Sequence, residues 1–93
     1  MANPIGRIQA MNAEIVSIDA AITQARAELD MLAHIDDDAQ RDAAVSERYE
    51  DRADAKRSAR DLARIRKYIS SLTSNQQRLI RRRDHEVARL AAG

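Results

Sequence analysis

The sequence has no cysteine, phenylalanine or tryptophan, and only one proline and two glycines in 93 residues. The lack of cysteine excludes disulfide bonds and thiolate chemistry. The N-terminus also lacks a signal-peptide pattern, so we expect a cytoplasmic protein. The longest uncharged run, residues 68–77, is too short to span a bilayer, and we expect no membrane span.

Charged residues make up 33% of the chain and are divided unevenly, although the net charge is only +1. Residues 1–54 contain five basic and twelve acidic residues, a net charge of −7. Residues 55–93 contain eleven basic and three acidic residues, a net charge of +8. This asymmetry favours antiparallel or head-to-tail pairing, within one chain or between chains.

The first third of the chain has the clearest periodicity. Asn3 suits a helix N-cap and Pro4 suits the first helical position, so we predict a helix over residues 4–34. Apolar residues then recur at alternating spacings of three and four, which is typical of a coiled-coil seam. With Met11 and Ala25 filling the pattern, the predicted seam residues are Ile8, Ile15, Ile18, Ile22, Leu29 and Leu32.

Three adjacent acids, Asp36, Asp37 and Asp38, fit a helix N-terminus, where free N–H groups and the helix dipole favour negative charge. We therefore predict a short turn near residues 34–38 and a second, antiparallel helix over residues 37–72. This register places Leu32 near residues 39–43 and Ile8 near residues 62–66.

The heptad spacing returns beyond residue 64, and a polar run at residues 70–75 separates its two halves. We predict a third helix over residues 75–91, with one helix continuous with the second as the alternative. The first helix cannot cover this region if it pairs with residues 39–63. The predicted second seam is Ile65, Ile69, Leu72, Leu79, Ile80, Val87 and Leu90.

These patterns predict a single all-α domain over residues 1–93, an antiparallel helical hairpin with coiled-coil packing that forms oligomers. We expect a non-enzymatic protein–protein interaction module, such as an adaptor, an assembly factor or a phage-type inhibitor of a host protein. Its partner would be a second copy in a homodimer, another helical protein, or both. The chain has no hydrolase, metalloprotease or phosphate-loop motif, and we expect no catalytic residue, metal or cofactor. His34 beside the three acids is better explained as part of a solvated turn than as a metal ligand.

The densest basic segment offers a patch for an anionic partner, formed by Arg78, Arg81, Arg82, Arg83 and Arg89. Nucleic-acid binding is the alternative function, disfavoured because no aromatic residue is interleaved for base stacking. An antiparallel hairpin with Asp36, Asp37 and Asp38 at its tip also resembles the coiled-coil arm of transcription-cleavage factors. That resemblance implies a transcription-associated protein whose tip acids meet the metal of RNA polymerase.

Overall fold

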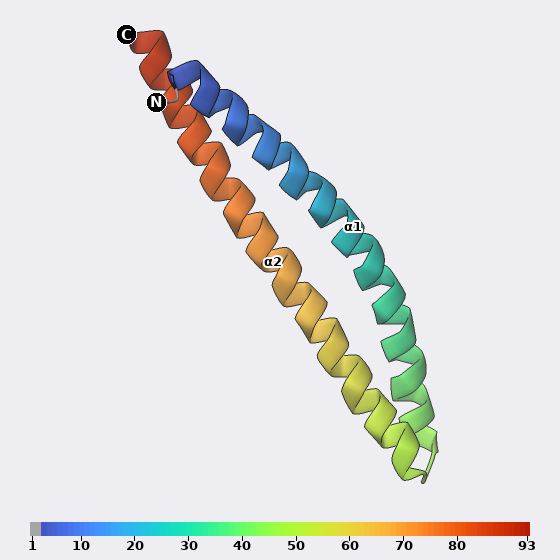
Figure 1. Cartoon of the computed structure of the whole chain (residues 1–93). Coiled ribbons are helices and arrows are strands. Elements are labelled where there is room, and N and C mark those ends of the chain that lie inside the picture. The colour runs from blue at the N-terminus through green and yellow to red at the C-terminus, as the bar shows by residue number, and fades with distance from the viewer. Residues whose placement is uncertain (1–2) are drawn as a thin grey trace. The chain divides into compact units, whose positions relative to one another are not determined.

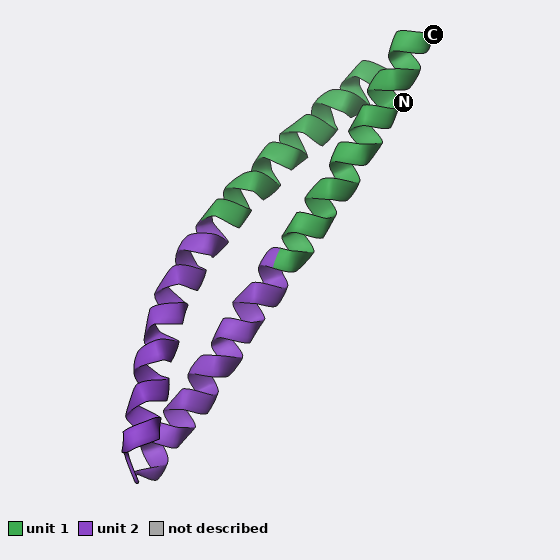
Figure 2. Ribbon diagram, turned by 180° about the vertical axis from the view of Figure 1, so that it is seen from behind, with its two compact units in different colours: residues 1–23, 70–93 green, residues 24–69 purple. Residues whose placement is uncertain are grey.

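The computed structural model describes residues 3–93 and consists of two helices joined by residues 46–48. Helix α1 spans Pro4–Val45 and helix α2 spans Tyr49–Ala92 (Figure 1). The chain divides into two compact units (Figure 2), each made of one antiparallel segment of each helix. Unit 1 contains residues 1–23 and 70–93, and unit 2 contains residues 24–69.

The start of α1 follows the sequence prediction. The side chain of Asn3 accepts a hydrogen bond from the backbone N–H of Gly6 at 2.6 Å, and the Asn3 carbonyl accepts one from Arg7. Pro4 takes the first helical position, where its missing N–H leaves no backbone acceptor unpaired. The N-cap prediction is therefore confirmed.

The prediction that the first helix ends near residue 34 is wrong. Helix α1 continues through the three acids for 42 residues in all. Asp36 accepts a hydrogen bond from Gln40 at 3.1 Å, and Asp38 accepts one from Arg41 at 2.7 Å. Such pairs three or four residues apart stabilise a helix interior, and this segment has no glycine or proline to interrupt the backbone.

The chain reverses at residues 46–48. The Ser46 N–H closes the last turn of α1 on the Asp42 carbonyl, and the Ser46 hydroxyl accepts a hydrogen bond from the Arg48 N–H at 3.0 Å. Glu50 and Asp51 then occupy the first turn of α2, where the helix dipole favours acids. The turn thus uses a serine hydroxyl and an acidic helix start, without glycine or proline.

Helix α2 is continuous for 44 residues, as in the alternative prediction that residues 75–91 continue the second helix. The predicted start of that helix at residue 37 is wrong, and a separate helix over 75–91 is not found. The polar run at residues 70–75 lies inside α2. Serine and threonine each destabilise a helix interior by about 0.5 kcal/mol relative to alanine, which is too little to break the helix. Within α2, Leu72 and Gln76 continue the three–four spacing of the less exposed side of the helix.

The turn position also corrects the predicted register. Leu32 packs against a cluster that contains Leu62 and Ile65, about twenty residues beyond the predicted neighbours. At the open end, Arg7 forms an ion pair with Glu86 at 3.4 Å, which places Ile8 far from residues 62–66. Because α1 extends to residue 45, each unit contains a segment of α1 that can pack against the segment of α2 in the same unit.

Candidate interaction surfaces

Most of the predicted seam residues face the other helix of the same chain. The buried seam residues are Ile22 and Ile65. The half-buried ones are Ile8, Ile15, Ile18, Leu29, Leu32, Ile69, Leu72, Leu79 and Ile80. Val87 and Leu90 are exposed, at 45% and 47% of their surface. The sequence had suggested that a short first helix leaves the second seam uncovered. In the structure, most of this seam is covered by α1.

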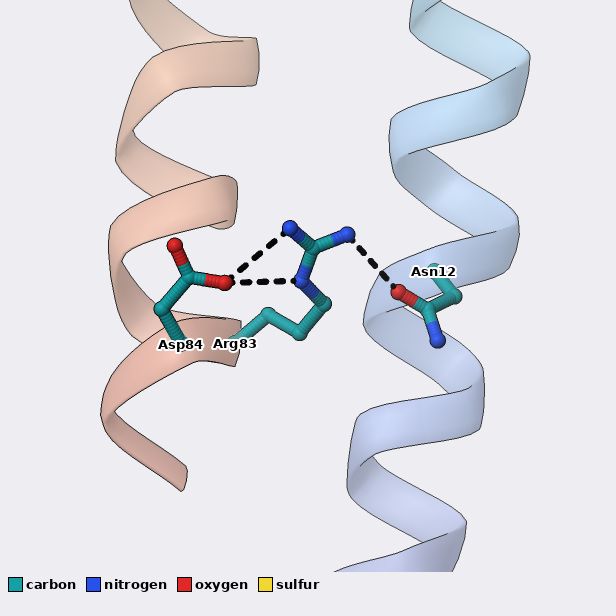
Figure 3. Close-up of polar contacts among 3 residues, drawn as sticks. All are labelled: Asn12, Arg83 and Asp84. Atoms are coloured by element: carbon teal, nitrogen blue, oxygen red, sulfur yellow. Dashed lines mark hydrogen bonds and ion pairs between the residues drawn. The ribbon is translucent and has the colours of Figure 1, made fainter. Parts of the chain in front are cut away.

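In unit 1, polar residues of α2 take inward positions and bond across to α1. Gln76 donates to the Ile15 carbonyl at 3.1 Å and to Asp19 at 3.4 Å. The Arg83 guanidinium donates to Asn12 at 3.1 Å while it also contacts Asp84 on its own helix (Figure 3). Polar residues at seam positions fix the register of paired helices, so these contacts determine which turns of α1 and α2 lie side by side.

Unit 2 has the more apolar interior. Ala25, Leu62 and Ile65 form a buried cluster, and four half-buried residues pack against it: Leu29, Leu32, Ala33 and Ile69. Nearer the turn, Gln40 donates to the Ala55 carbonyl at 3.0 Å. The seam of α1 continues past Leu32 through Asp36, Ala39 and Ala43, which are half-buried at the same three–four spacing.

The side of α1 that faces away from α2 in unit 1 carries no charge. We call it the α1 outer face, and its residues are all exposed: Gln9, Ala10, Ala13, Val16, Ser17, Ala20 and Thr23. Val16 leaves 68% of its surface in solvent. The Thr23 hydroxyl is already bonded to the Asp19 carbonyl at 3.1 Å. This face therefore presents small, mostly apolar groups to solvent over four turns of helix.

The predicted basic patch is divided by the structure. Arg83 lies in the seam with a side chain 30% exposed, so it is not available to an outside anion in the way that was predicted. Arg78, Arg81, Arg82 and Arg89 are exposed. Among residues 3–93, Arg78, Arg81 and Arg82 have no hydrogen-bonded or ion-paired partner. The anionic-partner patch is thus reduced to the outward arginines.

Unit 2 contains an acidic groove of about 480 Å³ between its two helical segments. Its charged lining is Asp38, Asp42, Asp51, Asp54, Arg57 and Asp61. Leu32, Ile35, Ala39 and Ser58 line the rest of it. Ser58 is 8% exposed, and its hydroxyl has no hydrogen-bond partner in the part of the chain that the structure describes.

The three acids predicted at the hairpin tip lie within α1, seven to nine residues before the helix ends, which removes the basis of the resemblance to transcription-cleavage factors. Within residues 3–93, no three histidine, aspartate or glutamate side chains are grouped closely enough to hold a metal ion. Neither helix of this described part contains a stretch long and apolar enough to cross a membrane.

Sequence reasoning missed both the α1 outer face and the acidic groove. The alanines at positions 10, 13 and 20 are regularly spaced, but the apolar seam on the opposite side of the same helix dominates the pattern. The groove depends on where the chain turns, because only a turn at residues 46–48 brings Asp42 and Asp51 to one surface. Comparison of this chain with protein-family models, with curated proteins and with solved structures found no match.

Proposed function

We propose that this protein is a non-enzymatic interaction module that binds another helical chain, a second copy or a different protein, by coiled-coil-type packing. The observation that carries the proposal is the uncharged α1 outer face. A solvent-facing helix surface usually carries charged residues, and a helix that is apolar on all sides usually has neighbours on more than one side.

The composition of that face suits close packing. Alanine side chains at positions 10, 13 and 20 allow a second helix to approach near the short end of the usual 8–10 Å range between helix axes. Val16 adds an exposed apolar side chain at the centre, whose complete burial is worth roughly 1.5–3 kcal/mol. The flanking polar residues Gln9 and Ser17 can remain hydrated at the rim of such a contact.

The thin interior of the hairpin supports the same proposal. Among residues 3–93 only six hydrophobic side chains are buried, and none has less than 2% of its surface exposed. Small folds with a limited core are commonly stabilised by association with another chain. A partner on the α1 outer face would extend the two-helix unit 1 to three or four helices.

The experiment is analytical ultracentrifugation of the wild-type chain and two double variants at high ionic strength, where charge pairing is screened. Val16→Asp with Ala20→Glu places two acids in the α1 outer face and should abolish association. Ser71→Asp with Ser74→Glu adds the same charge to exposed positions of α2 and should leave it intact. Equal association by the two variants would contradict the proposal.

A second candidate function, nucleic-acid binding, is favoured by a basic row on the exposed side of α2 in unit 2. Arg57, Arg60, Arg64 and Lys67 are all exposed and recur at spacings of three, four and three. Arg57 and Arg64 already form ion pairs with acids of their own helix, at 3.2 and 3.5 Å, which weakens this candidate.

Fluorescence anisotropy with labelled duplex DNA at low salt tests the second candidate. Retention that falls steeply with salt, and falls less steeply for Arg60→Glu with Lys67→Glu, would support it. Equal binding by wild type and variant would contradict it.

A further inference from the structure

The acidic groove of unit 2 has a charge imbalance that the chain itself does not neutralise. Three of its aspartates, at positions 38, 54 and 61, each pair with an arginine three residues further along the same helix, at 2.7 to 3.5 Å. The carboxylates of Asp42 and Asp51 have no such partner among residues 3–93. These two acids come from different helices and line the same groove.

The end of α1 adds to this imbalance. Asp42 lies in the last turn of α1, and no basic residue occupies that turn. The partial negative charge at a helix C-terminus disfavours an acid there and favours a cation. A positive group bound in the groove would therefore be attracted by two unpaired carboxylates and by the helix end.

Ser58, which also lines the groove, provides a second feature that a ligand could satisfy. The residue is only 8% exposed, and its hydroxyl has no hydrogen-bond partner in the described chain. A buried polar group without a partner costs roughly 1–3 kcal/mol. On rotating toward the groove that Ser58 lines, this hydroxyl could accept a hydrogen bond from a guanidinium N–H.

We propose that the acidic groove binds arginine side chains from the exposed basic segment of a second copy of this chain, Arg78, Arg81 and Arg82. The groove also has three apolar lining residues, Leu32, Ile35 and Ala39, which suit the aliphatic stem of arginine, and its carboxylates suit the forked head. The inference concerns a surface separate from the α1 outer face and does not depend on it.

Charge complementarity identifies the second copy as the occupant. Within residues 3–93, unit 2 contributes an acidic groove with two unpaired carboxylates, and unit 1 contributes three exposed arginines that have no partner. Each copy therefore carries both halves of the contact. Contacts of this kind guide association and fix which surfaces meet, and they weaken as salt rises.

The experiment measures the dissociation constant for self-association by sedimentation equilibrium at about 0.1 M and about 1 M ionic strength, between which the Debye length falls from about 10 Å to about 3 Å. We expect the wild-type chain to associate at the lower ionic strength and to weaken about tenfold or more at the higher one. A wild-type monomer at low ionic strength, or an association that does not respond to salt, would overturn the inference. Salt-independent association that is lost in the Val16→Asp, Ala20→Glu variant would overturn it while supporting the α1 outer face.

Two charge-reversal variants make the test specific. The groove variant, Asp42→Arg with Asp51→Arg, and the arginine variant, Arg78→Glu with Arg82→Glu, should each lose the salt-sensitive part of self-association. An equimolar mixture of the two should regain it, because the reversed groove of one then faces the reversed segment of the other. A mixture that regains no salt-sensitive association would overturn the inference.

A matched control separates the groove from the net charge of the protein. Asp30→Arg with Asp37→Arg changes the charge by the same amount on exposed positions of α1 that do not line the groove. This control should associate within about threefold of wild type. A loss equal to that of the groove variant would show that only the overall charge matters and would overturn the assignment of the site.

Discussion

Replacing Ser58 by alanine should stabilise the protein, which is unusual for a substitution at a buried position. The Ser58 hydroxyl is buried without a partner in the described chain, and removing it removes an unmet hydrogen-bonding group worth roughly 1–3 kcal/mol. Alanine also has a higher helix propensity than serine, by about 0.5 kcal/mol. Because the substitution loses the contacts of one oxygen atom, we expect a net gain of about 1.5 kcal/mol.

The control for this prediction is Ser71→Ala on the same helix. Ser71 is exposed, so its replacement changes helix propensity alone and should gain only about 0.5 kcal/mol. For a chain of this size 1 kcal/mol corresponds to about 4–8 °C in Tm, so we expect about 6–12 °C for Ser58→Ala and about 2–4 °C for Ser71→Ala.

Thermal unfolding followed by circular dichroism at high ionic strength measures both shifts without a contribution from charge-driven association. Equal shifts in the two variants would refute the reasoning. They would mean that the Ser58 hydroxyl is satisfied in solution, by water or by a backbone carbonyl, and that its burial carries no penalty.

Three further substitutions test the packing, the cap and the polar seam. Leu62→Ala should lower the free energy of unfolding by about 2–3 kcal/mol, because Leu62 is only 7% exposed. Leu90 is 47% exposed, and Leu90→Ala should change this free energy by less than about 0.5 kcal/mol. Urea unfolding of both variants measures the contrast. Asn3→Ala should cost about 1 kcal/mol through loss of the hydrogen bond to Gly6 and increase amide exchange in the first turn of α1, and unchanged protection there would contradict the capping role. Arg83→Ala should destabilise the chain by about 1 kcal/mol, since it removes the hydrogen bond to Asn12. Arg81→Ala on the exposed side should be neutral within about 0.5 kcal/mol. The same unfolding assay compares the two variants, and equal effects would show that the cross-helix hydrogen bond contributes nothing.

The positions that face inward were largely predictable from the sequence, because the three–four spacing is a property of one helix and needs no partner to be read. The spacing from Ile8 to Leu32 and from Ile65 to Leu79 matches the buried and half-buried sides of α1 and α2. The N-cap at Asn3 was predictable for the same reason, since capping depends only on the residues of the first turn.

The position of the turn was not predictable from the same local signals. Three consecutive acids are equally compatible with a helix start and with a helix interior that pairs Asp36 with Gln40 and Asp38 with Arg41. The turn at residues 46–48 contains no glycine or proline, so the usual marker is missing. The predicted turn came too early in the chain, so the second seam was expected to lack a helix to pack against. The same error gave the wrong register between the two helices.

The sequence by itself determined that the chain is helical and which stripe of each helix is apolar, since both follow from residue type and spacing within one segment. Only the tertiary structure decided which turns of α1 and α2 lie opposite each other, through contacts such as that between Arg83 and Asn12. It also decided that Asp42 and Asp51 share a groove and that Ser58 is buried beside them. Surfaces built from two helices depend on the length of the first one, and that length depends on the balance of weak interactions at residues 34–48.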